Sequence, residues 1–133
     1  MTPHQFDLIR VTLRELRHQP ARAAQLFYGR LFSQCPRLRP LFGAHLDLDG
    51  SRLFWALSTA VAGLSYRERF AALLELLVQP EAREHLRDPE HVAAIGEALQ
   101  WMLEHGLGEF YVAEVHEAWQ AAHESFARAM ASG

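Results

Sequence analysis

The chain has 133 residues and a mass of 15.1 kDa, which allows a single domain spanning residues 1–133 and leaves little room for a second. Half of the residues are hydrophobic, so a sizeable core can form, whereas the lone cysteine, Cys35, excludes an internal disulfide and a cysteine-based zinc finger. The net charge of −3 argues against a broad nucleic-acid-binding surface.

The composition favours an all-α fold. Leu and Ala together supply 40 residues, whereas Val, Ile and Thr together supply 11. The chain has no run of about 18 apolar residues, so we expect no membrane span and no membrane partner. Because the first residues lack a basic stretch followed by an apolar run, we expect no secretory signal and a cytoplasmic location.

Two helices open the chain. Thr2 is a natural cap and Pro3 suits the first helical position, and apolar residues follow at helical spacing as far as Leu16. A second helix is predicted from Pro20 through Phe32, with apolar residues again on one face.

A turn and a third helix follow. Pro36 and Pro40 bracket a short turn. In the connection from position 43 to position 50, Asp47 and Asp49 are candidate caps for a helix whose apolar positions begin at Leu53.

The second half of the chain contains the remaining helices. An apolar stretch from position 70 to position 78 is interrupted by Pro80, because proline removes a helical donor and clashes with the preceding turn. Asp88 and Pro89 signal a new helix that we expect to end at Gly106. A last helix carries Trp119 in its apolar stripe. The sequence thus predicts a bundle of six to seven helices.

Motifs of hydrolases and zinc enzymes are missing from the sequence. Eight histidines are many for this length, but none lies at the spacing of a metal-binding helix motif. The chain also has no Cys-x-x-Cys pair, no Gly-rich phosphate loop and no nucleophile elbow. We therefore expect each histidine, taken singly, to be a solvated surface residue.

Two separated blocks of sequence resemble a known family. The run from Gln25 to Phe42, with Tyr28 in it, is similar to the second helix and following corner of globins. The second block is similar to the last two globin helices. It consists of the segments that begin at Pro89 and at Glu104 and of the stretch that ends at Trp119. The resemblance is closest to bacterial single-domain haemoglobins and to the globin domain of flavohaemoglobins, and it extends from about position 6 to position 130. It implies a globin-like bundle that binds haem b through its iron.

The resemblance assigns roles on the distal side of the haem. Phe42 matches the phenylalanine that wedges against the haem, and Tyr28 matches the tyrosine whose hydroxyl donates to iron-bound oxygen. Leu53 matches the apolar residue above the iron, and Arg52 is placed to meet a haem propionate, for which a guanidinium is well suited. Asp49 falls where the family usually has Gln or His, although an aspartate there also suits a helix cap.

The proximal side departs from the family pattern. Globin iron is held by one histidine, which in related sequences lies seven residues before the proline that matches Pro89. Here that position is Ala82, and the nearest histidine is His85. Either His85 ligates the iron after a shortened corner, or the ligand has been lost. His45 is a weaker candidate for a sixth ligand, and Val92 replaces a tyrosine that supports the proximal histidine in flavohaemoglobins.

Two functions follow from the resemblance. The first is a haem globin that binds oxygen, nitric oxide or carbon monoxide for transport, storage, sensing or detoxification, as a monomer or homodimer. Enzymatic nitric oxide dioxygenation would require an external reductase, because we expect no reductase domain in this chain. The second is a haem-free globin-fold module, sensory or partner-binding, whose cavity holds an apolar ligand or is filled by side chains.

Overall fold

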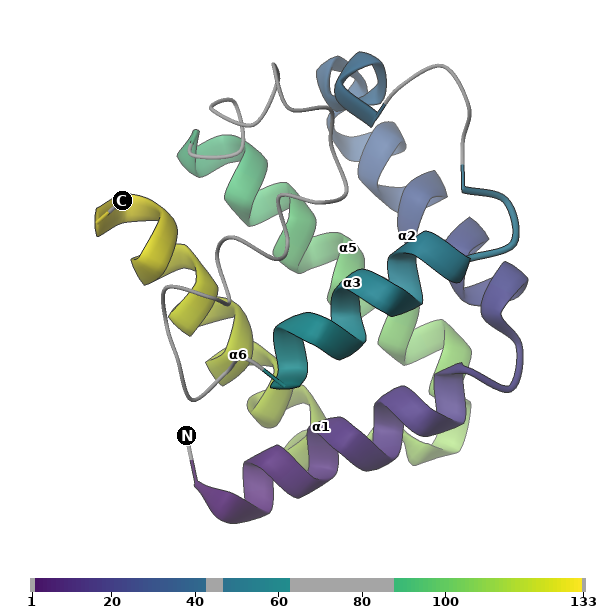
Figure 1. Ribbon diagram of the computed structural model, residues 1–133, viewed down its shortest axis with the longest axis vertical. Coiled ribbons are helices and arrows are strands. Elements are labelled where there is room, and N and C mark those ends of the chain that lie inside the picture. Colours follow the sequence, from purple (N-terminus) through teal and green to yellow (C-terminus); the bar gives the residue numbers. More distant parts are fainter. Residues whose placement is uncertain (1, 43–46, 63–87, 133) are drawn as a thin grey trace.

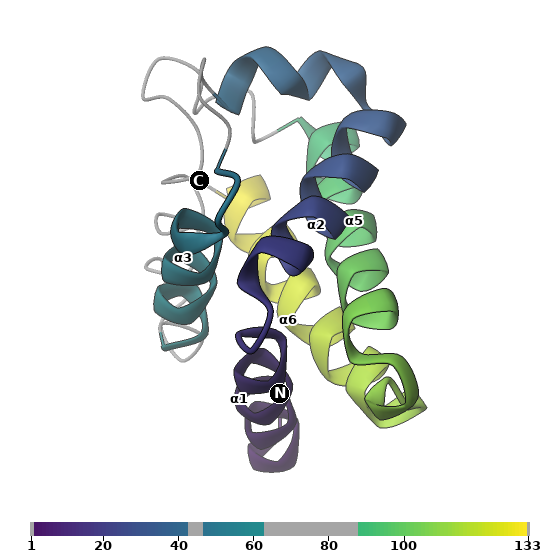
Figure 2. The same cartoon turned by 90° about the vertical axis from the view of Figure 1, so that its right-hand side faces the viewer.

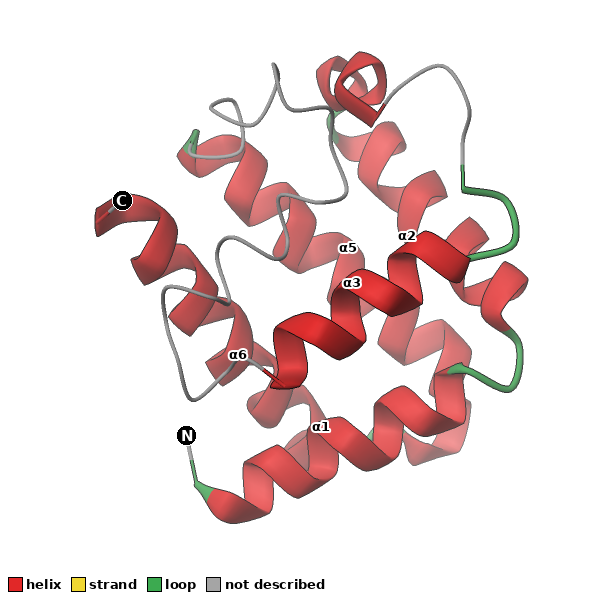
Figure 3. Ribbon diagram, viewed as in Figure 1, coloured by secondary structure: helices red, strands yellow, loops and turns green. Residues whose placement is uncertain are grey.

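The computed structural model describes residues 2–42, 47–62 and 88–132, and these residues form helices joined by short connections (Figures 1 and 3). The elements are α1 (Pro3–Leu16), α2 (Pro20–Gln34), η1 (Pro36–Phe42), α3 (Ser51–Ala62), α5 (Pro89–Leu107), η4 (Gly108–Phe110) and α6 (Ala113–Ser132). The described residues contain no strand, which confirms the all-α class. None of their helices is both long and apolar enough to cross a bilayer.

The predicted helix starts are confirmed. The Thr2 hydroxyl accepts a hydrogen bond from the Gln5 amide, and the Gln5 side chain accepts one from the Thr2 amide, which completes a capping box. Asp88 accepts a hydrogen bond from the Glu90 amide at 2.9 Å and caps α5.

Two elements differ from the prediction. The short turn expected around Pro36 and Pro40 and ending at Phe42 is a 3-10 helix over Pro36–Phe42. Helix α5 passes through Gly106 and ends at Leu107, because it is Gly108 that adopts the positive φ of +58°. Gly106, which does not take a positive φ, continues the helix, whereas Gly108 ends it.

The helices pack in a crossed arrangement. Helix α2 packs against α5, α1 packs against α6, and α3 contacts both α1 and α2. Figure 2 shows α3 and α5 on opposite sides of the molecule. The described core draws on every α-helix, and its most deeply buried large side chains are Phe27, Ile9, Leu31, Leu38, Leu53, Met102 and Leu103.

A buried hydrogen bond joins the first and last helices. The Trp119 indole donates from Nε1 to the Thr12 hydroxyl at 2.9 Å, and that hydroxyl donates to the Leu8 carbonyl at 2.7 Å. The hydrogen bond to Thr12 thus satisfies the indole N–H, which burial would otherwise leave without a partner.

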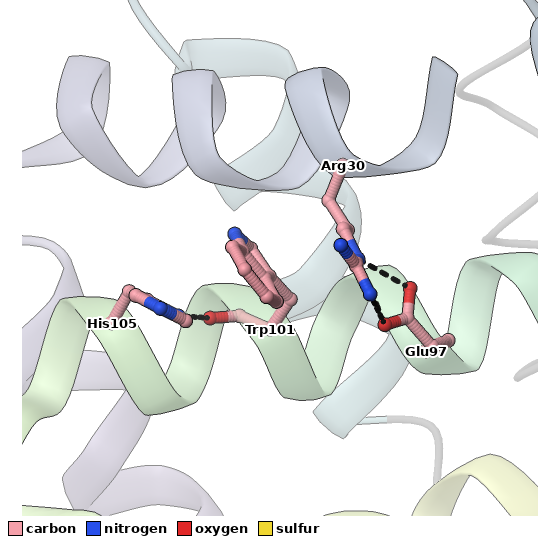
Figure 4. Close-up of polar contacts among 4 residues, drawn as sticks. All are labelled: Arg30, Glu97, Trp101 and His105. Atoms are coloured by element: carbon pink, nitrogen blue, oxygen red, sulfur yellow. Dashed lines mark hydrogen bonds and ion pairs between the residues drawn. The ribbon is translucent and has the colours of Figure 1, made fainter. Parts of the chain in front are cut away.

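The contact between α2 and α5 is completed at its edge by a polar and aromatic cluster (Figure 4). Arg30 pairs with the Glu97 carboxylate at 2.8 Å, and its guanidinium lies 4.1 Å from the ring centroid of Trp101. The Trp101 ring stacks in turn on His105 at a centroid distance of 4.0 Å. These contacts fix the rotation of α2 about its axis relative to α5.

Gly50 sets how closely α3 approaches α2. Its φ is +78°, its carbonyl accepts the Phe54 amide at 2.9 Å, and a Cβ atom built there would overlap the carbonyl of Pro20. The first turn of α3 can therefore lie against the start of α2 only with glycine at position 50.

Two glycine substitutions are expected to change stability in opposite directions. Gly50→Ala should lower the free energy of unfolding by about 2 kcal/mol or more, because it combines a left-handed backbone with a clash against backbone atoms. Gly29→Ala, inside α2 with open space around its Cβ, should raise it by about 0.5–1 kcal/mol. Chemical denaturation of both variants checks this, and equal effects at the two positions would show that α3 is not held against α2 as described.

Candidate functional site

The candidate site lies where α2 faces the start of α3, and its central residue is Tyr28. The Tyr28 side chain is buried, with 4% of its surface exposed. Its ring stacks on Phe32 and meets Phe42 edge-on, with centroid distances of 5.9 Å in both cases. The phenol therefore sits in an aromatic cluster built from α2 and η1.

The Tyr28 hydroxyl is satisfied by a carboxylate. It donates to Oδ2 of Asp47 at 3.2 Å. The same Oδ2 accepts the Leu53 amide at 2.8 Å, and Oδ1 accepts the Arg52 amide at 3.2 Å. One carboxylate thus receives three donors, two from the first turn of α3 and one from α2.

Local sequence explains this arrangement. The first amides of a helix have no partner within the helix, and an aspartate shortly before it supplies acceptors. Asp49 acts in the same connection, where its Oδ1 accepts the Ser51 amide at 2.9 Å. The prediction that Asp47 and Asp49 cap this helix is confirmed, and Asp47 additionally reaches across to Tyr28.

The electrostatics favour a neutral phenol and an ionised Asp49. Burial raises the pKa of Tyr28 well above its ordinary value of 10.0, and the charge and hydrogen bond of Asp47 raise it further. The Arg52 cation acts in the opposite direction on the same pKa. The hydrogen bond from the Ser51 amide lowers the pKa of the exposed Asp49 carboxyl below its usual range.

A groove of about 230 Å³ runs along α2 beside this pair. Its wall is mostly apolar, and Tyr28 and Asp47 both line it. The complete lining among the described residues is Ala24, Gln25, Tyr28, Gly29, Phe32, Asp47 and Leu48. The Tyr28–Asp47 hydrogen bond therefore lies at the boundary between this groove and the core.

The predicted distal residues gather in one region. Phe42 contacts Tyr28, whereas Leu53 is fully buried and is joined to Tyr28 through Asp47. The side chains of Arg52 and Asp49 are exposed beside them. The two predicted iron ligands, His85 and His45, lie outside the described residues.

Two features of this region were not predicted. Nothing in the sequence pairs Asp47 with Tyr28, because a contact across 19 positions leaves no periodic signal. The expectation that a histidine, taken singly, is a solvated surface residue is wrong for His91, which is 7% exposed in the first turn of α5. In that turn His91 and Val92 are buried, whereas Pro89 and Glu90 are exposed.

The described residues contain no group of three or more His, Cys, Asp or Glu side chains arranged to hold a metal ion. No protein-family model matches the chain, and no curated protein is significantly similar to it in sequence. The function is therefore inferred from the residues and their geometry.

The raised pKa of Tyr28 predicts a pH dependence. Because the folded protein holds the phenol neutral, its contribution to stability is complete below about pH 10, the ordinary pKa, and is lost as the pH rises toward the folded value. We expect Tyr28 to ionise only well above pH 10, and the free energy of unfolding to fall over that range.

Absorbance of tyrosinate, followed with denaturation at each pH, tests this prediction. Tyr28→Phe should remove the latest ionisation and flatten the fall in stability, whereas Tyr111→Phe should leave that latest ionisation in place. Ionisation of Tyr28 at an ordinary pKa would contradict the burial and the hydrogen bond described above.

Proposed function

We propose that the chain is a haem-binding globin that binds a diatomic ligand such as oxygen, nitric oxide or carbon monoxide. The observation that carries the proposal is the gathering of Tyr28, Phe42 and Leu53 at the junction of α2, η1 and α3. These are the residues to which the globin resemblance assigns the distal wall. They come from three separate elements, so their convergence does not follow from sequence proximity.

The chemistry of these side chains fits the distal half of a haem pocket. Haem presents a large apolar face, and the buried Phe27, Phe42, Leu53 and Leu57 supply apolar surface of the kind that excludes water from iron. The Tyr28 hydroxyl is a polar donor within that surface, and the exposed Arg52 suits a propionate at the edge. We expect Leu74 and Leu77 to add to this apolar wall, and both lie outside the described residues.

Bound haem would supply reversible binding of the diatomic ligand at iron, with His85 as the proposed protein ligand and His45 as a weaker candidate on the other side. The chain's own residues would exclude water and orient one hydrogen-bond donor. Turnover as a nitric oxide dioxygenase would further require reducing equivalents from a separate reductase. A monomer and a homodimer are both compatible with this proposal.

A haem-free globin-fold module is the second candidate, and one observation favours it. The Tyr28 hydroxyl already has an acceptor in Asp47, so the buried phenol needs no haem-bound ligand to be satisfied. In that case the groove beside α2 would hold a small apolar molecule or remain a surface feature.

Reconstitution with haem separates the two candidates. We expect the purified protein to give a Soret band at a stoichiometry of about one haem per chain, because a globin holds a single haem on one proximal histidine. His85→Ala should abolish or shift that band, whereas His18→Ala, a change of an exposed histidine, should leave it unaltered.

The absorption spectrum is the measurement in each case. A missing Soret band in the unmodified protein would favour the haem-free module. A band of unchanged position and intensity in His85→Ala would show that His85 does not ligate the iron.

A further inference from the structure

The Tyr28 hydroxyl carries a single proton, which restricts what it can do. A phenol donates one hydrogen bond at a time. In the structure that bond goes to Oδ2 of Asp47 at 3.2 Å. A ligand at the haem iron and the Asp47 carboxylate would therefore compete for the same proton.

Asp47 is a strong competitor because of its surroundings. An ionised acceptor makes a hydrogen bond stronger than a neutral one does. Two backbone amides at the start of α3 hold this carboxylate in place. The Leu53 amide donates to Oδ2 at 2.8 Å, and the Arg52 amide donates to Oδ1 at 3.2 Å. The oxygen that accepts the phenol is thus fixed by the backbone of α3, the helix that carries Leu53.

A purely structural role for Asp47 would not require its hydrogen bond to the Tyr28 side chain. To cap α3, an aspartate needs only backbone donors, as Asp49 does with the Ser51 amide. Asp47 differs because it also binds the side chain of the predicted distal tyrosine. Among the described residues, the charged groups that act on that phenol are Asp47, in the connection before α3, and Arg52, in the first turn of α3.

We propose that Asp47 is a positioning residue of the distal pocket, which holds the Tyr28 hydroxyl toward α3 and so weakens its hydrogen bond to a diatomic ligand. This inference rests on the proposed haem-binding function. It implies that the protein releases oxygen quickly, because Tyr28 contributes little while its hydroxyl donates to Asp47.

The test is a cycle of four proteins: the unmodified chain, Asp47→Asn, Tyr28→Phe and the double variant. Asparagine keeps the size of the side chain and remains a good helix cap, but its neutral amide is a weaker acceptor for the phenol. Oxygen release from the reduced, haem-loaded proteins is measured by stopped flow. Asp88→Asn is the matched control, because it removes a capping charge at the start of α5 instead.

We expect Asp47→Asn to slow oxygen release about two- to tenfold, the effect of one added hydrogen bond. That slowing should vanish in the double variant, because it acts through the Tyr28 hydroxyl. Tyr28→Phe alone should speed release, but by a smaller factor than Asp47→Asn slows it, because the phenol contributes only a weakened hydrogen bond, and Asp88→Asn should leave release unchanged. Asp47→Ser, which retains a cap, replaces Asp47→Asn if the latter does not fold.

A second measurement needs no haem. The Cζ carbon signal of labelled tyrosine reports the hydrogen bonding of the phenol, and its loss in Tyr28→Phe assigns the signal. We expect Asp47→Asn to shift the Tyr28 signal in the haem-free protein. A change of helix packing alone would shift the signals of Tyr28 and Tyr111 alike, whereas the proposal requires a shift of Tyr28 alone.

The outcomes separate the inference from the proposed function. An unshifted Tyr28 signal in Asp47→Asn overturns the positioning role. A shifted signal with unchanged oxygen release overturns the effect on the ligand while haem binding stands. If the unmodified protein takes up no haem, the proposed function is wrong and the role in ligand release is wrong with it, whereas a shifted Tyr28 signal would still support the pairing.

Discussion

The burial of Tyr28 depends on the carboxylate of Asp47. A phenol hydroxyl placed among aromatic rings without an acceptor would cost about 1–3 kcal/mol, and the first amides of α3 would lack partners as well. Asp47 satisfies all three donors with two oxygens. It thereby fixes the position of α3 relative to α2 and allows an otherwise apolar wall to contain one polar group.

Helix α2 connects this wall to the rest of the bundle. Its inner face buries Phe27 and Tyr28, while Arg30 at its edge is held by Glu97 and Trp101 of α5. Because side chains are fixed to one helical backbone, a rotation of α2 that moved Tyr28 would also break the Arg30 contacts. The Arg30 contacts at the surface and the aromatic cluster around Tyr28 therefore stabilise the same orientation of α2.

Local features of the fold were largely predictable from the sequence. The caps at Thr2 and Asp88 and the apolar stripes follow from rules that act within a few residues. The end of α5 was misplaced by one residue, because composition does not show that Gly108, rather than Gly106, takes the positive φ. Tyr28, Phe42 and Leu53 were proposed as distal residues from a resemblance, and the structure brings these three residues together. The pairing of Tyr28 with Asp47 and the burial of His91 depend on tertiary packing, which periodicity does not report.

The central claim is that haem binds beside Tyr28, Phe42 and Leu53. Amide and side-chain NMR spectra of the protein, recorded as haem is added, test this claim most directly. The account predicts that the largest changes occur at Tyr28, Phe42 and the first turn of α3, and that they saturate at about one haem per chain. Changes confined to the contact between α1 and α6, or no saturable change at all, would contradict it.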